Sequence, residues 1–389
     1  MKNCLRIPRM LLPREGFDKW AVIACDQFTQ DRAYWERVAR TVADAPSTLR
    51  FILPEVYLGE EDEEARIAAV RKCMYDALES DVLTKLTRGL VFCERTTRTG
   101  VRRGILCCID LEEFSSEEGV PALIRSSEEV LPARLAPRLA ERENVPLEFP
   151  HAILFYRDKK DIAVKTLLRE ELEQLYDFDL MEGGGHLTGW FVPEDCAEEI
   201  VQLLHGKGEP AFAVADGNHS VAAAKAHWEN VKRTLKKEET ARHPARFMLC
   251  ELVNLYDPSV VFYPIHRLVK DVETEAFCDF FMKNVRCRRE GNVLIPALPA
   301  GAEGVRRTDE LCEAFVRANG GAIDYVHGDR ELALRASQED CAGVMLAAMD
   351  KDDFFPALKG GVNFPKKTFS LGGAKEKRYY LEGREISYD

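Results

Sequence analysis

The sequence predicts an α/β fold, with α+β as the alternative, built around a mixed β-sheet. Short apolar runs with the length of buried strands alternate with amphipathic stretches along all 389 residues. The runs VFCERTTRTG and VRRGILCCID, at residues 91–100 and 101–110, are typical of a β-hairpin, so a purely parallel sheet is not expected. We therefore predict antiparallel and parallel strands in one sheet, covered by helices.

The individual elements follow from these patterns. Strands are predicted at residues 20–26, 89–95, 103–111, 151–158, 211–217, 246–257 and 323–329. Apolar residues recurring at i, i+3 and i+4 predict helices at residues 61–81, 161–177, 193–208, 218–238 and 271–285. No repeat or low-complexity linker marks a domain boundary. We place one where the last of these helices begins, which gives a main α/β region at residues 1–270 and a smaller C-terminal α/β segment at residues 271–389.

Composition limits the classes of partner. The 54 basic and 66 acidic residues give a net charge of −12, which argues against a broad nucleic-acid surface. No apolar run reaches the ~20 residues of a spanning helix, and Arg9 and Pro13 interrupt the apolar N-terminal stretch where a secretion signal would lie. The 12 cysteines form no CxxC pair, so we expect reduced, buried thiols. These observations predict a cytoplasmic protein with no membrane partner.

The most informative motif joins an apolar strand to an alanine-rich helix. The turn between them carries five successive residues that can take part in binding or catalysis: Asp216, Gly217, Asn218, His219 and Ser220. The first N–H groups of a helix lack intrahelical acceptors and attract anions, and glycine allows close backbone approach. Asp216 ends the strand and is placed to hold a metal ion or a substrate hydroxyl. The alternative interpretation is an ordinary helix cap with a glycine turn.

Several further strings accompany this motif, and together they resemble one protein family over nearly the whole chain. They are IACDQF, APSTLRFILPEVY, LIRSSEEVL, ARLAPRLAEREN, LEFPHAILFYRD, FYPIHRLV, YVHGD and NFPKKTFSLGGAKEKRYYLEGREI. The family is the bacterial and archaeal one known as domain of unknown function 1015. Its DG[HN]H element is similar to that of the ParB/sulfiredoxin-like superfamily, which includes CTP-binding partitioning proteins, ATP-using sulfiredoxins and free serine kinases.

This resemblance implies a nucleotide phosphate site at Gly217, Asn218, His219 and Ser220. The commoner pattern in the family is DGHHR, whereas this chain has Asn218 for the first histidine and Ser220 for the arginine. An arginine binds phosphate through a bidentate, charge-assisted hydrogen bond, so its loss must be compensated if the site transfers phosphate.

Three other cations are candidates for that compensation: Arg125, Arg134 and Lys367. The two arginines, like Arg138, match basic positions in the family strings. Lys367 lies in a turn rich in lysines and hydroxyls, although by composition alone it also suits a surface strand. Glu128 is a candidate general base or a partner for one of the arginines.

The neighbouring charged residues Arg138, Glu141 and Arg142 are interpreted as a solvated helix face. Asp26 and Glu55 are further carboxylates in family-matching strings, and we prefer Asp26 as a catalytic group, with an N-terminal helix cap as the alternative.

The histidines at positions 151, 186, 219 and 266 show no HxH or HExxH spacing, so they do not predict a metal site by themselves. The Gly-rich sequence 183–186 is a weak phosphate signal and a candidate lid hinge.

We therefore predict a nucleotide-binding enzyme, a small-molecule phosphotransferase of free-serine-kinase character. The proposed catalytic residues are Asp216, His219, Asp26 and Glu128, with Asp216 as the metal ligand and Mg²⁺ plus ATP, ADP or CTP as cofactors. The expected partners are a small-molecule substrate and a nucleotide, with a homodimer left open. The alternatives are a ParB-like regulatory or chromosome-partitioning protein without catalysis and, third, a metal-dependent hydrolase.

The charge balance generates a first test. Double-stranded DNA should bind only weakly, above micromolar Kd at physiological salt, with or without nucleotide, because a chain of charge −12 offers few cations to displace counterions. Fluorescence anisotropy with a labelled duplex measures this. Submicromolar, sequence-specific binding would favour the partitioning alternative.

Overall fold

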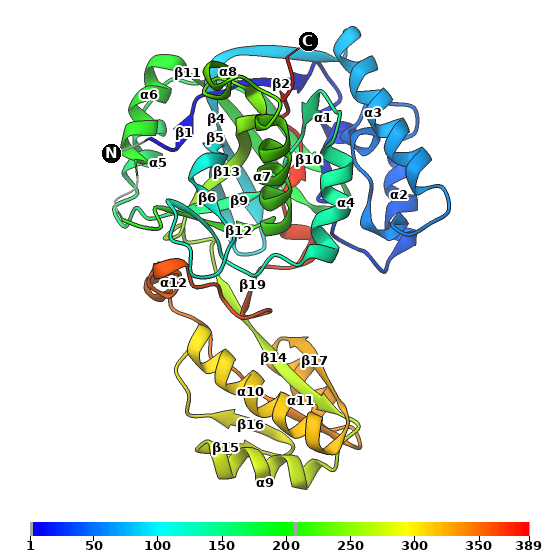
Figure 1. Ribbon diagram of the computed structural model, residues 1–389, viewed down its shortest axis with the longest axis vertical. Helices are drawn as coiled ribbons and strands as arrows, with labels where there is room; N and C mark the ends of the chain where they lie inside the picture. The colour runs from blue at the N-terminus through cyan, green and yellow to red at the C-terminus, as the bar shows by residue number, and fades with distance from the viewer. Residues whose placement is uncertain (1–2, 206–207, 389) are drawn as a thin grey trace. The chain divides into compact units, whose positions relative to one another are not determined.

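The computed structural model describes residues 3–205 and 208–388, and the chain forms two compact units (Figure 1). Unit 1 comprises Met1–Val260 and Gly373–Asp389, and unit 2 comprises Val261–Gly372. The strand at residues 262–270, which the sequence analysis assigned to the main region, is thus part of unit 2. The last 17 residues return to unit 1 and complete it.

Unit 1 is built on a large mixed sheet, as predicted. The strands follow the order β10 (Glu173–Leu180), β11 (Gly185–Pro193), β4 (Leu83–Thr97), β5 (Gly100–Asp110), β13 (Phe247–Asn254), β9 (Ile153–Tyr156), β12 (Phe212–Asp216), β7 (Ile124–Ser126) and β6 (Phe114–Ser115), with β1 (Leu5–Arg6) beside β5 and β2 (Arg9–Pro13) beside β4. Most neighbours are antiparallel, but β9 and β13, β7 and β12, and β6 and β7 are parallel. The predicted hairpin is confirmed, with Thr97 opposite Gly100.

Both faces of this sheet are buried, because alternate residues of each central strand enter different apolar clusters. Leu90 and Phe92 face one cluster and Val91 and Cys93 the other. The first face packs against α5 (Ile162–Leu167), α6 (Glu194–Leu203) and α7 (Asn218–Lys232). The second packs against the N-terminal helices α1 (Phe17–Trp20), α2 (Arg32–Val42) and α3 (Glu63–Glu79) and against the C-terminal tail. In Figure 1, α7 lies beside α4 (Pro132–Arg142).

One predicted helix is wrong in its second half. The helix expected at residues 161–177 ends at Leu167, and residues 173–180 form β10 instead. Tyr176 and Leu180 alternate into the core, and β10 pairs along its length with β11. Pairing and burial on the sheet outweigh the helical preference of a glutamate-rich segment. The helices expected at residues 61–81, 193–208, 218–238 and 271–285 are confirmed in shorter form.

Unit 2 is a smaller three-layer α/β structure. Its sheet has the order β15 (Cys287–Glu290), β16 (Val293–Pro296), β18 (Cys341–Val344), β14 (Phe262–Lys270) and β17 (Ala322–His327), with β19 (Phe369–Leu371) beside β14. One face packs against α9 (Thr274–Asn284) and α10 (Ala302–Asn319), and the other packs against α11 (Asp329–Ala336). The short α12 (Lys351–Ala357) precedes β19.

The C-terminal tail is attached to unit 1 by two short strand pairs. The strand β20 (Tyr379–Tyr380) pairs with β3 (Val22–Ile23), and β21 (Arg384–Glu385) pairs with β8 (Leu147–Glu148). The indole N–H of Trp20 donates to the Leu381 carbonyl at 2.9 Å. The tail is therefore an integral part of the second core of unit 1.

Buried ion pairs fix the tail as well. The Arg378 guanidinium donates to Glu251 at 3.2 Å and also to Glu382, and all three side chains are less than 5% exposed. Arg384 pairs with Glu148 at 2.5 Å in the same buried manner. Burial by itself lowers the pKa of Arg378, but the facing carboxylates raise it overall, so the arginine stays charged.

All twelve cysteines lie in the described part of the chain and are free, and nine of them are buried. The expectation that most of the thiols are buried is thus confirmed. Across residues 3–205 and 208–388, the helices lack the combination of length and hydropathy needed to cross a bilayer.

Replacing Arg378 by alanine should lower the free energy of unfolding by about 3–5 kcal/mol, because the buried Glu382 loses its arginine partner and the buried Glu251 keeps only Arg102. Urea unfolding followed by tryptophan fluorescence measures the loss. Arg14→Ala, which removes an ion pair with Asp81 that is largely exposed, is the control and should cost less than about 1 kcal/mol. Equal losses in the two variants would contradict the structural importance of the buried cluster.

Candidate functional site

The predicted strand, glycine turn and helix are present, and the turn is tightly packed. β12 ends at Asp216, Gly217 takes a left-handed conformation with φ 84°, and α7 begins at Asn218. A Cβ on residue 217 would lie 3.1 Å from the Cα of Ala152. Positive φ and close backbone approach both require glycine here. The first turn of α7 thus lies against the start of β9.

Asp216 faces a lysine that the sequence analysis did not select. The Lys377 ammonium donates to the Asp216 carboxylate at 2.8 Å, and the two side chains are only 20% and 16% exposed. Burial lowers the pKa of Lys377, but attraction to Asp216, Asp26 and Glu128 outweighs it and raises the pKa overall. Lys377 is therefore a charged, largely desolvated cation.

Asp26 and Glu55 converge on Arg138. The Arg138 guanidinium lies 2.5 Å from a Glu55 carboxylate oxygen and 3.7 Å from one of Asp26. Burial raises the pKa of Asp26, but His151, the Gln27 amide and the cations Arg138 and Lys377 lower it overall. The preferred carboxylate, Asp26, is thus ionised beside two cations.

His151, at the start of β9, lies between these groups. Its Nε2 is 3.5 Å from the Ser220 hydroxyl, and its ring packs edge-on against Tyr380 with 5.2 Å between centroids. Burial lowers the pKa of His151 in spite of Asp26 and Asp216, which act in the opposite direction. His151 is therefore a neutral imidazole at neutral pH, able to accept a proton.

Asn218 and His219 form hydrogen bonds within the protein framework. The Asn218 side-chain oxygen accepts from the Ser126 hydroxyl at 2.7 Å and from the Ser127 N–H at 3.0 Å. His219 Nε2 accepts the Leu131 N–H at 3.1 Å, and burial together with Arg138 and Arg134 lowers its pKa to about 4. Both side chains thereby hold α7 against the segment between β7 and α4.

The other predicted site residues do not all lie near the turn after β12. Arg125 is fully buried and donates to the carbonyls of Glu117 and Val120, both at 2.9 Å, so it supports a loop. Arg134 is exposed on α4, close enough to His219 to lower its pKa. Glu128 is half-buried and acts electrostatically on Lys377.

Lys367 is exposed and belongs to unit 2. Of the three cations proposed from the sequence, only Arg134 is thus near the first turn of α7 within unit 1.

The interpretation of Arg138, Glu141 and Arg142 as a solvated helix face is wrong. The side chains of Arg138 and Arg142 are 10% and 12% exposed, because α4 packs beside α7. Together with Glu148 and His151 they line a cavity of about 110 Å³. Desolvation by burial raises the pKa of Glu141 to about 7, in spite of the nearby Arg138.

Three residues of this cluster were not selected from the sequence: Lys377, which was overlooked, and His151 and Arg138, which were assigned no catalytic or binding role. Each lies inside a string that carried the family resemblance, and His151 directly precedes an apolar strand. The pairing of β20 with β3, the packing of α4 on α7 and the pairing of β9 with β12 bring Lys377, Arg138 and His151, respectively, to the end of β12.

Metal ligation by protein side chains alone is not indicated. The described residues contain no group of three or more His, Cys, Asp or Glu side chains arranged to hold an ion. His186 instead pairs with Asp177 and Asp179 on the β10–β11 hairpin at 2.9 and 2.8 Å, and in unit 2 His266 pairs with Asp329 at 2.9 Å.

The fold and this cluster define a mixed α/β protein with a charged site at the end of a central strand. Comparison with known proteins assigns its family: residues 9–355 match the model described as protein of unknown function (DUF1015), and the chain belongs to that family. A solved structure of a conserved hypothetical protein from Pyrococcus furiosus is similar at 10% identity and a TM-score of 0.33, over 72% of this chain and 94% of that one. No curated protein matches. The ParB/sulfiredoxin-like character of the Asp216 turn stays a prediction.

The partly buried Glu141 should make stability depend on pH. The folded-state pKa of about 7 lies above that of an unfolded glutamate, so the folded state holds the proton longer. The favourable contribution is complete below about pH 4.5 and is lost as the pH rises through 7.

We therefore expect the unfolding free energy of the wild type to fall relative to Glu141→Gln between pH 4.5 and 7, by at most about 3 kcal/mol, and to level off above that range. Urea unfolding at a series of pH values measures the difference. A difference that is constant with pH would mean that Glu141 is solvated.

Proposed function

We propose that the chain is a cytoplasmic nucleotide-binding enzyme, a small-molecule phosphotransferase whose site lies at the first turn of α7. The observation that carries this proposal is the convergence of two largely buried cations, Lys377 and Arg138, with the carboxylates of Asp26 and Asp216 at a helix N-terminus. Cations and helix N–H groups stabilise phosphate oxygens, and carboxylates bind hydroxyls or metal ions.

In this proposal, Lys377 and Arg138 supply the positive charge that Ser220 lacks. A serine in place of the family's usual arginine can donate one hydrogen bond but carries no charge. Lys377 and Arg138 are held in place by Asp216 and Glu55 and are shielded from solvent, which strengthens their attraction to a phosphate. They are better placed for this role than Arg125, whose guanidinium binds loop carbonyls.

In the proposed reaction, the hydroxyl oxygen of a small acceptor attacks the terminal phosphorus of the nucleotide. The new O–P bond forms as the bond to the bridging oxygen of the nucleotide breaks, and that oxygen leaves with the electron pair. The neutral imidazole of His151 accepts the hydroxyl proton, and Asp26 and Asp216 stabilise the resulting imidazolium. Lys377 and Arg138 stabilise the charge on the transferring group.

The carboxylates also suit Mg²⁺, which prefers oxygen ligands and is often bound through one or two carboxylates plus phosphates and water. Asp216 and Asp26 would hold it, and the ion would neutralise phosphate charge. This donor set agrees with the absence of a three-ligand protein cluster among the described residues.

A second candidate is a nucleotide-binding regulatory protein without catalysis. The hydrogen bonds of Asn218 and His219 to the β7–α4 segment favour it, because ligand binding at α7 would act directly on that segment. No specific observation favours the metal-dependent hydrolase.

A ligand panel tests the binding site. At least one of ATP, ADP and CTP, with Mg²⁺, should stabilise the protein by about 2.7 kcal/mol at 100 times its Kd in a thermal-shift assay. Lys377→Met should weaken that binding by one to two decades through loss of a charge-assisted hydrogen bond of about 1.5–3 kcal/mol. Gly217→Val should abolish it by blocking backbone approach.

Lys375→Met, an exposed lysine of the same tail segment, is the matched control and should bind like the wild type. Binding that survives both Gly217→Val and Lys377→Met would place the nucleotide elsewhere. Nucleotide binding without release of the dephosphorylated nucleotide, across a panel of hydroxyl-bearing acceptors, would favour the regulatory candidate.

A further inference from the structure

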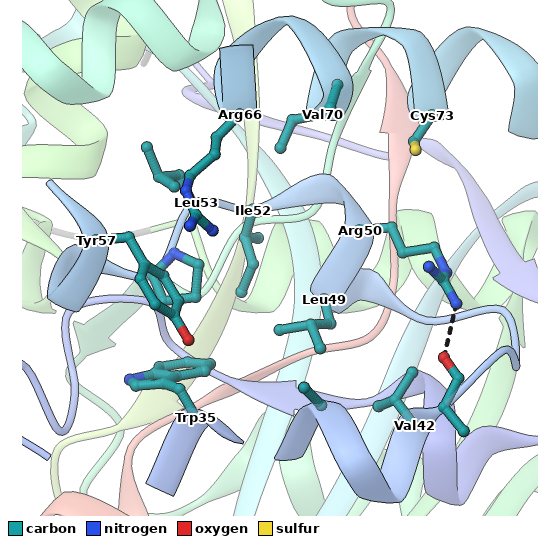
Figure 2. Close-up of a pocket in the computed structure, with 14 residues that line it drawn as sticks. Trp35, Val42, Leu49, Arg50, Ile52, Leu53, Tyr57, Arg66, Val70 and Cys73 are labelled. Carbon is teal, nitrogen blue, oxygen red and sulfur yellow. Dashed lines mark hydrogen bonds between the residues drawn. The ribbon is translucent and has the colours of Figure 1, made fainter. Parts of the chain in front are cut away.

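A second concave site in unit 1 adjoins the charged cluster, since Ile52 lines both this site and the cavity beside Arg138. It is a pocket of about 380 Å³ between α2 and α3, closed on a third side by the segment that contains η1 (Thr48–Phe51) and η2 (Glu55–Tyr57) (Figure 2). The volume is roughly two and a half times that of an engineered 150 Å³ cavity that binds benzene. It also falls in the ordinary range for small-molecule sites.

The walls are mainly apolar and include two aromatic rings. Figure 2 shows Trp35 and Tyr57 at one side and Val42, Leu49 and Val70 toward the other. Such a lining binds a hydrocarbon chain or a ring by removing its surface from water.

Two arginines border the pocket, and their charges are compensated differently. Arg66 pairs with Asp62 at 2.9 Å and with Glu60 at 3.4 Å, and its guanidinium lies 4.5 Å from the centre of the Tyr57 ring. Its charge is therefore already balanced by neighbouring carboxylates.

Arg50 has no such balance. Its Nη2 donates to the carbonyl of Ala43 at 2.8 Å and to that of Ala45 at 3.4 Å, as the dashed line in Figure 2 shows for one of them. Within residues 3–205 and 208–388 no carboxylate forms an ion pair with it. A guanidinium has five N–H donors, so the Nε and Nη1 groups retain donors, each of which can form a charge-assisted hydrogen bond to a carboxylate oxygen.

From the apolar walls and this unbalanced guanidinium, we propose that the pocket binds a small apolar monocarboxylate, with its hydrocarbon part among the walls and its carboxylate on Arg50. The C-terminal end of α2 carries a partial negative charge, which disfavours an anion beside it. This effect at an exposed helix end is weaker than a charge-assisted hydrogen bond. The pocket size suits a chain of about eight carbons or a one-ring acid. This inference does not rest on the proposed function.

Octanoate and its neutral analogue octanol are suitable probes, measured by isothermal titration calorimetry at concentrations where octanoate does not self-associate. The wild type should bind octanoate saturably at one site per chain and should bind octanol at least tenfold more weakly. Arg50→Gln should weaken octanoate binding at least tenfold and leave octanol binding unchanged. Arg40→Gln, an exposed arginine of α2 outside the pocket, should behave like the wild type.

A second pair of variants tests the location without removing the hydrogen bonds of Arg50. Ala69 is an exposed residue of α3 that lines the pocket, and Ala68 is its exposed neighbour that does not. Ala69→Phe should fill the pocket and abolish binding of both probes, whereas Ala68→Phe should not. The proposal is overturned if neither probe binds, if octanol binds as tightly as octanoate, if Arg50→Gln has no effect, or if binding survives Ala69→Phe.

Discussion

The candidate site of unit 1 depends on how the C-terminal tail is fixed in the core. Arg378 lies between Glu251 of β13 and Glu382 of the tail, with all three charges buried. Buried charges are costly unless they are paired, so the arrangement is restrictive: the tail must occupy this path for Arg378 to pair with Glu382 and with Glu251, which Arg102 also contacts at 3.3 Å. The pairing of β20 with β3 then sets the register, with Tyr379 opposite Ile23 and Tyr380 opposite Val22.

That register brings the charged side chains of the candidate site together. Because the two strands are antiparallel, the residues that precede β20 lie beside those that follow β3, and Lys377 therefore comes close to Asp26. The antiparallel contact of β9 with β12 does the same for His151 and the Gly217 turn. Two short strand contacts and the packing of α4 on α7 thus assemble one charged cluster at the end of β12.

The balance of charge in this cluster explains the protonation states of its members. Each cation has a carboxylate partner, since Lys377 contacts Asp216 and Arg138 contacts Glu55. His151 and His219 have no comparably strong partner, and burial keeps both neutral. The same desolvation holds the proton on Glu141 in the adjoining cavity. A site with a neutral base beside ionised carboxylates can accept a proton without first rearranging its charges.

The secondary-structure elements that follow from local periodicity could be predicted from the sequence alone. Alternating apolar residues fixed the β4–β5 hairpin, and helical periodicity fixed α3, α6, α7 and α9. The glycine turn after β12 was evident because its residues are contiguous. The features that depend on contacts between distant segments could be known only from the tertiary structure. Residues 173–180 form a strand because they pair with β11. The charged face of α4 is shielded from solvent because α4 packs beside α7. Lys377 was brought to Asp216, 161 residues away in the chain, by a strand pair of two residues, which is too short for its pairing to be read from a local pattern.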